Sequence, residues 1–360
     1  MIIQDRLVQT FTDLVRIDSP SSGEGKTAEY VAQRLRALGL KPKTDALFNV
    51  TAVLDGSGEP FLLNAHMDSV APCLGIKPQV DKERGMITSD GTTILGADDR
   101  AGVAAILEAL QVLRDRNVRH RALEIAITVQ EETGLSGARA LDLSTFQSKM
   151  GAVLDSHGPV GGIVVASPSQ NQIKATITGK AAHAGLEPEK GVSAILVAAE
   201  AIAAMPVGRI DAETTANIGV IHGGSARNIV PEKCELTGEA RSRRESKLKR
   251  QTNAMARALE SAARRRGARV DVRIERAYDL YRISPGAEIV RVLSAAIERI
   301  GRQPRLEASG GGSDANVFNA NGIAALPVSV GYEKIHTTEE FVPIEELVKT
   351  AQLVVELAQP

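Results

Sequence analysis

Residues 101–129, AGVAAILEALQVLRDRNVRHRALEIAITV, place a long run of helical spacing directly before a short run of almost unbroken apolar residues. The second run begins at Leu123 and has the length and composition of a buried strand. Outward from this stretch, short apolar runs recur between helical segments, as NVTAVL (49–54), FLLNA (61–65), GAVLD (151–155) and IVVAS (163–167). This alternation predicts an α/β domain whose mixed sheet is flanked by helices.

The rhythm changes from about Gln172. The predicted order becomes βαββαβ, with strands at 173–179, 214–222, 234–241 and 269–277, a helix at 193–205 and a long basic helix before the last strand. Such an order describes a compact α+β domain of ferredoxin-like type. The α/β rhythm returns after about Pro285 and ends in a helix from Ile344. We therefore expect a discontinuous catalytic domain, residues 1–171 and 285–360, interrupted by a lid domain, residues 172–284.

Length and charge narrow the class of protein. A chain of 360 residues exceeds the size at which one core usually stops growing, which favours two domains. A net charge of −1 gives no electrostatic reason to expect nucleic acid or an anionic membrane as partner. The basic stretch RSRRESKLKR (241–250) has no interleaved aromatic residues, so a solvated helix face explains it better than a nucleic-acid surface. A small neutral or zwitterionic substrate fits this balance.

The cysteines and the N-terminus bear on the compartment. Cys73 and Cys234 lie far apart and have no Cys or His nearby at metal-ligand spacing, which predicts two free buried thiols in a reducing compartment. Charged residues at Asp5, Arg6 and Asp13 interrupt the first apolar segment, so it resembles neither a signal peptide nor a membrane span. We expect a cytoplasmic protein.

Histidines and carboxylates follow several of the apolar strands. They occur in FLLNAHMD (61–68), ILGADD (94–99), IAITVQEE (125–132), GAVLDSH (151–157) and ALPVSVGYEKIH (325–336). In open α/β sheets the carboxyl ends of the strands line the ligand crevice, so side chains distant in sequence can converge there. Two imidazoles and several carboxylates together suggest a zinc site.

The first two of these segments also have plainer interpretations. His66 and Asp68 are two residues apart, and strand geometry turns them to the same side, so Asp68 can accept the second ring N–H of His66. By itself the pair could be a salt bridge in a loop. Asp98 and Asp99 precede a helix that starts in small residues, where one carboxylate can cap the helix and the other can bind a metal.

The remaining segments carry similar alternatives. Glu131 and Glu132 end an apolar strand, and two neighbouring anions at a buried edge repel each other unless a cation or hydrogen bonds compensate. A metal ligand beside a general base would explain both residues, whereas an exposed strand end would simply solvate them. Asp155 and His336 would complete two coordination sets, although a lone histidine such as His336 is more often a loop residue.

The motifs HMD, GADDRAG, EETG, LDS and GYEKIHTTEEF, taken in order, resemble the zinc aminopeptidase and carboxypeptidase family that includes peptidase T, aminoacylase and glutamate carboxypeptidase. The resemblance covers nearly the whole chain. It is closest to the peptidase T branch, in GGGSDANVF (310–318) and in the strand that leads to GYEKIH. One departure is Ser313, where that branch commonly has Thr.

The resemblance implies a site that holds two Zn²⁺ ions, which Co²⁺ or Mn²⁺ could replace. Its five ligands would be Asp98 as the bridge, His66 and Asp155 in one set, and Glu132 and His336 in the other. Asp68 would orient His66, and Glu131 would take a proton from the attacking water. The family pattern also implies a cis peptide bond between Asp98 and Asp99.

The resemblance extends to the lid domain. The segment GKAAHAG makes His183 a candidate donor to the oxyanion, and GGSARNIVPE and GEARS place Asn228 and Arg241 at the substrate. His183 could instead only cap a turn, and Arg241 could pair within the lid. The segment GGGSD (310–314) lacks the lysine that follows the glycines in a phosphate loop. We therefore expect Gly311 and Gly312 to offer backbone groups to the substrate. Because a small βαββαβ unit leaves sheet edges that tend to pair, we expect a homodimer through this domain.

The predicted reaction is metal-dependent hydrolysis of amide bonds in small peptides. A tripeptide aminopeptidase agrees best with the peptidase T branch. An N-acyl amino acid amidohydrolase, a dipeptidase or a carboxypeptidase would need the same metals and differ only in the pocket. A non-enzymatic metal-binding scaffold would have lost the base, whereas Glu131 is present.

Overall fold

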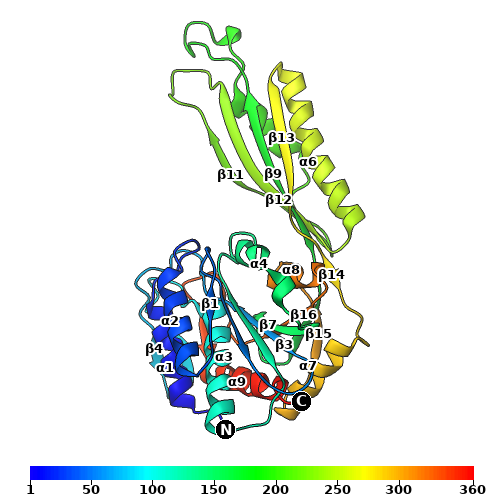
Figure 1. Ribbon diagram of the computed structural model, residues 1–360. Helices are drawn as coiled ribbons and strands as arrows, with labels where there is room; N and C mark the ends of the chain where they lie inside the picture. Colours follow the sequence, from blue (N-terminus) through cyan, green and yellow to red (C-terminus); the bar gives the residue numbers. More distant parts are fainter. The chain divides into compact units, whose positions relative to one another are not determined.

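The computed structural model describes residues 1–360, which divide into two compact units (Figure 1). The first unit comprises Met1–Val165, Arg282–Ala308 and Ser313–Pro360. The inserted unit comprises Ala166–Tyr281 and Ser309–Gly312. None of the helices combines the length and the apolar character needed to cross a membrane.

A nine-stranded mixed sheet organises the first unit. Its strands, in spatial order, are β1 (Lys43–Thr44), β2 (Val50–Leu54), β6 (Leu123–Thr128), β3 (Phe61–His66), β7 (Met150–Ser156), β16 (Ala324–Ser329), β8 (Gly162–Ser167) and β14 (Tyr281–Arg282), with β15 (Arg305–Ala308) paired to β8. The four central strands β6, β3, β7 and β16 run parallel, whereas β2 and β8 are antiparallel to their neighbours. The carboxyl ends of the parallel strands therefore meet at one edge.

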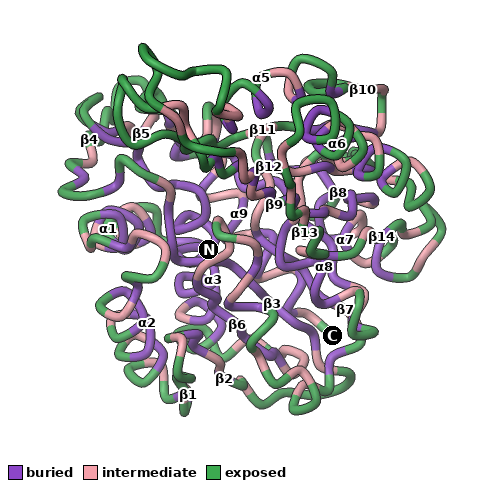
Figure 2. The backbone as a smooth tube through the Cα atoms, turned by 90° about the horizontal axis from the view of Figure 1, so that it is seen from above, coloured by how far each residue is buried: buried purple, intermediate pink, exposed green.

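Helices cover this sheet. They are α1 (Gln4–Arg16), α2 (Gly25–Ala37), α3 (Ala97–Asp115), α4 (Ser136–Ala140), α7 (Glu288–Arg299), α8 (Asp314–Ala320) and α9 (Ile344–Leu357). Every residue of β3 and β6 is buried, so both faces of the sheet are covered at its centre, as Figure 2 shows for this region and for α3. A separate small sheet pairs β4 (Gln79–Asp81), β5 (Met86–Thr88) and β17 (Phe341–Pro343).

Small residues bring the start of α3 close to the sheet. A side chain on Gly102 would place its Cβ 2.5 Å from a carboxylate oxygen of Asp99 and 2.6 Å from the carbonyl oxygen of Leu154 on β7. Only glycine leaves room for that approach. The run AGVAA thus fixes the distance between the loop before α3 and the end of β7.

The inserted unit is built from one antiparallel sheet and two helices. Its elements are β9 (Ser169–Thr178), α5 (Ala194–Ala204), β10 (Gly208–Asp211), β11 (Thr214–Gly223), β12 (Lys233–Ser242), α6 (Glu245–Arg266) and β13 (Arg269–Tyr278), and the strands lie in the order β10-β11-β12-β9-β13. Burial alternates along β9, so one face of the sheet packs on α5 and α6. The core includes Ile173, Ile177, Val197, Met255 and Leu259.

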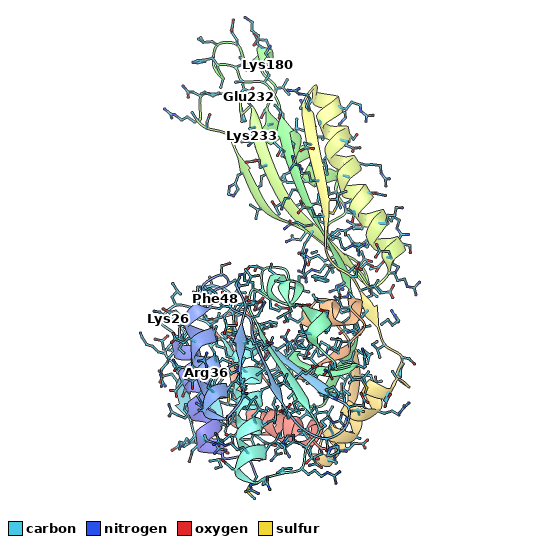
Figure 3. All side chains as sticks on the ribbon, viewed as in Figure 1. Lys26, Arg36, Phe48, Lys180, Glu232 and Lys233 are labelled. Atoms are coloured by element: carbon cyan, nitrogen blue, oxygen red, sulfur yellow. The ribbon has the colours of Figure 1, made fainter.

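The predicted βαββαβ order is present, with one addition. The short strand β10 pairs with the first residues of β11, and its sequence GRID gave no strand signal because it is brief and largely polar. Lys180, Glu232 and Lys233, labelled in Figure 3, mark the end of this sheet where β9 finishes and β12 starts.

Candidate active site

His66 is the last residue of β3 and is buried. Its Nδ1 lies 3.3 Å from Asp68 Oδ1, and its Nε2 lies 3.1 Å from Asp98 Oδ1 and 3.8 Å from Asp155 Oδ1. Burial lowers the pKa of His66, but the hydrogen bonds to Asp68 and Asp98 outweigh it and hold the pKa well above its ordinary value. One ring nitrogen is therefore oriented by a carboxylate while the other faces two more.

Asp98 and Asp99 take different roles: Asp99 caps the helix, and Asp98 faces the two histidines. The peptide bond between them is cis, as the family pattern implies. Asp99 is buried and accepts hydrogen bonds from the backbone N–H groups of Gly102 and His66, so it caps α3 and ties it to β3. Asp98 instead turns its carboxylate to both histidines, with Oδ2 3.4 Å from His336 Nε2. Although burial opposes it, these two imidazoles hold the pKa of Asp98 far below its usual range.

Glu131 and Glu132 begin a turn after β6. Both of their backbone N–H groups donate to the carboxylate of Asp68, at 3.0 and 3.3 Å, so Asp68 fixes this turn as well as His66. Glu132 Oε1 lies 2.9 Å from His336 Nε2. Burial, together with the nearby negative charge of Asp155, raises the pKa of Glu131 well above its ordinary value. Glu131 can therefore hold a proton more readily than an ordinary glutamate, whereas Glu132 is paired with His336.

Asp155 and His336 complete the arrangement. Asp155 lies at the end of β7, where burial and the charge of Asp98 raise its pKa well above the usual range. His336 belongs to the loop between β16 and β17, and its hydrogen bonds to Asp98 and Glu132 raise its pKa to about 10. A protonated imidazole supplies the positive charge that the two carboxylates need. A divalent cation would displace that proton.

These residues form two overlapping donor groups. His66, Asp98 and Asp155 make one, Asp98, Glu132 and His336 make the other, and in each group the donor atoms lie within 4.8 Å of one another. His66, Glu131 and Glu132 satisfy the same distance. Imidazole and carboxylate donors with one shared carboxylate suit a pair of divalent metal ions. The buried, mutually repelling carboxylates fit that occupant, because cations would neutralise them.

Several supporting residues were not singled out from the sequence. The hydroxyl of buried Tyr332 donates to Asp155 Oδ1 at 3.0 Å. Glu340 is buried and accepts hydrogen bonds from the backbone of Gly96 and Asp98. Both residues stand in the motif GYEKIHTTEEF, which has five aromatic or acidic positions, and nothing in the local sequence distinguishes the buried ones from the exposed ones.

Asp314 is a further buried carboxylate near the site. Thr128 Oγ1 and Asn64 Nδ2 donate to its Oδ2, while its Oδ1 has no hydrogen-bond partner. Burial raises the pKa of Asp314 to about 6. It starts α8 directly after Ser313, whose capping box with Asn316 sets the start of the helix.

The other predicted residues lie in the inserted unit, and the contacts described for them stay within that unit. His183 is exposed in the loop after β9, and its Nδ1 accepts the backbone N–H groups of Gly185 and Leu186, both at 3.2 Å. With Nδ1 used as an acceptor, Nε2 is the ring nitrogen left to donate a hydrogen bond. The carbonyl of Asn228 accepts the N–H of Ala184, so Asn228 lies beside the same loop.

Arg241 and the two glycines are also placed within the inserted unit. Arg241 on β12 forms a two-pronged ion pair with Glu239, at 2.8 and 3.0 Å, which is the internal pairing open to it from the sequence. The carbonyl of Gly311 accepts from Ser167 Oγ at 2.9 Å. A Cβ on Gly312 would fall 2.3 Å from the ring of Tyr278, so packing alone requires glycine there. The roles of these residues toward substrate remain predictions.

Comparisons with known proteins agree with this architecture. Residues 168–267 match the model of the peptidase dimerisation domain of family M20, and residues 49–200 match the model of peptidase family M28. The protein YqjE of Bacillus subtilis (strain 168) is 45% identical over 369 residues, covering 100% of this chain and 99% of the relative.

Two solved structures are similar over nearly their full length. The aminopeptidase PepT of Bacillus cereus ATCC 10987 has a TM-score of 0.86 and 45% identity, covering 99% of this chain and 98% of its own. A tripeptidase of Staphylococcus aureus subsp. aureus Mu50 has a TM-score of 0.91 and 39% identity, covering 100% of this chain and 98% of its own. With an imidazole–carboxylate site on this mixed α/β fold and identities of this size over whole chains, the protein belongs to the peptidase T-like branch of the M20 metallopeptidases.

Proposed function

We propose that this protein is a dinuclear zinc aminopeptidase that hydrolyses short peptides, with tripeptides as its preferred substrates. The observation that carries the proposal is the pair of donor groups that share Asp98, with Glu131 beside them. Similarity to an aminopeptidase and a tripeptidase over nearly the whole chain supports the substrate class.

In the proposed site Asp98 would be shared by the two ions. His66 and Asp155 would hold one ion with it, and Glu132 and His336 would hold the other. A set of two imidazoles and three carboxylates suits zinc, and cobalt or manganese accept the same donors. Bound zinc lowers the pKa of water to roughly 7 and polarises a carbonyl group.

Glu131 performs the proton transfers in this proposal. Its pKa is raised by burial and by Asp155, so the carboxyl holds a proton more readily than an ordinary glutamate does, as a proton acceptor in catalysis requires. Glu131 takes the proton from the attacking water and gives it to the leaving amine. Asp68 supports both partners, because it orients His66 and holds the turn that carries Glu131.

The inserted unit supplies the substrate contacts in the proposal. His183 donates from Nε2 to the developing oxyanion. Asn228, Arg241, Gly311 and Gly312 contact the carbonyl or carboxylate groups of the peptide. The bidentate Arg241–Glu239 pair supports a guanidinium already held in a defined direction, although substrate would have to compete with Glu239.

We also propose a homodimer through the inserted unit. Residues 168–267 match a dimerisation-domain model. Only the first residues of β11, Thr214–Ala216, pair with β10, so its later part from Asn217 has a strand on one side alone. Val220 and Ile221 there are 45% and 48% exposed. An open edge with exposed apolar side chains favours pairing with a second copy.

The compartment proposed for this dimer is the cytoplasm. Cys73 and Cys234 are both buried and free, as expected in a reducing environment. Cell fractionation tests the compartment, and light scattering of the purified protein tests the dimer. A monomer at all working concentrations would contradict the homodimer.

A hydrolysis screen tests the reaction and the substrate class. Metal-free protein is loaded with zinc, cobalt or manganese and given tripeptides, dipeptides, N-terminally blocked tripeptides and N-acetylated amino acids. We expect the highest kcat/KM for tripeptides with a free amino terminus. A higher kcat/KM for N-acetylated amino acids than for any tripeptide would replace the aminopeptidase by an amidohydrolase.

A further inference from the structure

Glu340 ties together two loops that each carry a proposed metal ligand. It stands four residues after His336 in the loop between β16 and β17, and only 1% of the residue is exposed. Its Oε2 accepts the N–H of Gly96 at 2.7 Å, and its Oε1 accepts the N–H of Asp98 at 3.0 Å. Both carboxylate oxygens are thus used on the backbone of the loop that carries the bridging aspartate, 242 residues away in sequence.

The opposite side of Asp98 is held as well. Ser69 Oγ donates to the carbonyl of Asp98 at 3.3 Å and accepts from Arg100 Nη2 at 2.9 Å. Arg100 is itself fully buried and donates to the carbonyl of Val15. Side chains therefore fix the peptide groups both before and after Asp98, which leaves its carboxylate free to face His66 and His336.

The loop that carries Glu340 is closed on itself. Glu333 and Phe341 exchange two backbone hydrogen bonds, at 3.0 and 3.2 Å, and the N–H of Glu340 donates to the carbonyl of Thr337. His336 and Glu340 therefore lie on one closed loop. Glu340 hydrogen-bonds to the backbone of the loop that carries Asp98. The orientations of the His336 and Asp98 side chains therefore depend on the same set of hydrogen bonds.

We propose that Glu340 is a positioning residue that holds Asp98 between the two metal positions and couples the His336 loop to them. It touches neither substrate nor metal and acts through the backbone N–H of Asp98. The inference rests on the proposed dinuclear site and extends it. Residues that orient metal ligands in this indirect way typically change metal affinity by roughly 10- to 100-fold when they are mutated.

Glu340→Gln tests the inference in the full-length protein. The amide keeps the size of the side chain but offers one oxygen and one N–H₂, so one of the two backbone N–H groups loses its acceptor. Glu339→Gln is the matched control, because the neighbouring Glu339 is exposed and pairs only with Lys334. Zinc is titrated into each metal-free protein by calorimetry, and the visible spectrum of the cobalt-loaded forms is recorded.

We expect Glu340→Gln to weaken at least one of the two metal-binding steps by roughly tenfold or more and to alter the cobalt spectrum. The value of kcat should fall while KM stays near that of the wild type, since Glu340 does not contact substrate. Glu339→Gln should behave as wild type in all these measurements. Unchanged metal affinities in a folded Glu340→Gln protein would overturn the inference, even if its melting temperature were lower.

A second variant covers the case in which Glu340→Gln does not fold. Ser69→Ala removes the donor to the Asp98 carbonyl from the other side and should weaken metal binding severalfold through the same aspartate. Unchanged affinity there would then overturn the inference. The proposed function fails separately, if wild-type protein binds two metals but cleaves none of the peptides.

Discussion

The two units hold their candidate functional residues in different ways. In the first unit each proposed ligand has a partner far away in sequence: His66 has Asp98, Asp155 has Tyr332, and Glu132 has His336. In the inserted unit the side chain of His183 hydrogen-bonds only to backbone groups two and three residues away, and its loop is exposed. The first unit therefore presents a preorganised site, whereas the inserted unit presents locally held side chains. Changes in the first should cost far more activity than changes in the second.

Removal of the metal is the strongest test of this contrast. We expect dialysis against a chelator to abolish peptide hydrolysis and readdition of zinc to restore it. The reason is that the five ligand side chains act in the proposed reaction only by holding the ions. Metal analysis should give two ions per chain, since one shared carboxylate joins two donor groups. A stoichiometry that saturates at one ion with full activity would contradict the dinuclear site.

Glu131→Gln should produce the next largest loss. A positioned proton acceptor contributes roughly 10²- to 10⁴-fold to kcat, and metal content should stay near that of the wild type. Glu132→Gln is the matched comparison, because the same change one residue later removes a proposed ligand and should lower bound metal. If Glu131→Gln kept more than about a tenth of kcat, the base would lie elsewhere.

His183→Ala should lower kcat by less than Glu131→Gln does, and it should leave bound metal unchanged. Loss of one oxyanion donor costs up to roughly 10²- to 10³-fold. His222 on β11 is exposed and lies in the same unit, so His222→Ala serves as the control. Equal kcat for His183→Ala and the control would leave His183 with only its turn contacts to Gly185 and Leu186.

Arg241→Lys should raise KM by roughly tenfold for carboxylate-ended peptides, because an ammonium group cannot reproduce the two-pronged geometry of a guanidinium. Amidated peptides should be affected less. The pair with Glu239 offers the competing explanation, in which Arg241 only stabilises the sheet. In that case the melting temperature would fall while KM for both kinds of peptide stayed unchanged.

The smallest effect concerns pH and separates the two units directly. In the metal-free first unit the pKa of Asp314 is raised to about 6, and those of Glu131 and Asp155 are raised further above their ordinary values. A pKa that is higher in the folded state favours the protonated folded form. Their stabilisation is therefore present below about pH 4 and is lost as the pH rises through about 6 and above.

The inserted unit should respond in the opposite direction. Hydrogen bonds from the backbone of Glu213 and from Lys247 lower the pKa of Asp211 to about 2, so its contribution is present above about pH 4 and lost as the pH falls toward 2. Hydrogen exchange of metal-free protein, corrected for intrinsic rates, should show weaker protection of the first unit at pH 8 than at pH 5. Zinc should remove that difference, and its persistence in the zinc-loaded protein would contradict the assigned ligands.

The sequence by itself determined the α/β alternation, the inserted βαββαβ order and the residues that compose the donor groups. These were accessible because His66, Glu131 and Asp155 each follow an apolar run, and parallel strands bring their carboxyl ends together whatever the intervening chain. The motif resemblance then assigned them roles.

Only the tertiary structure decided which side chains support those residues. Tyr332 meets Asp155 across 177 positions of sequence, and Glu340 meets Asp98 across 242. The neighbours Glu339 and Glu340 are chemically identical, yet one is exposed and pairs with Lys334 while the other is buried against the Asp98 loop. The local sequence does not predict which of the two glutamates is buried, because burial depends on which backbone N–H groups the folded chain leaves without an acceptor.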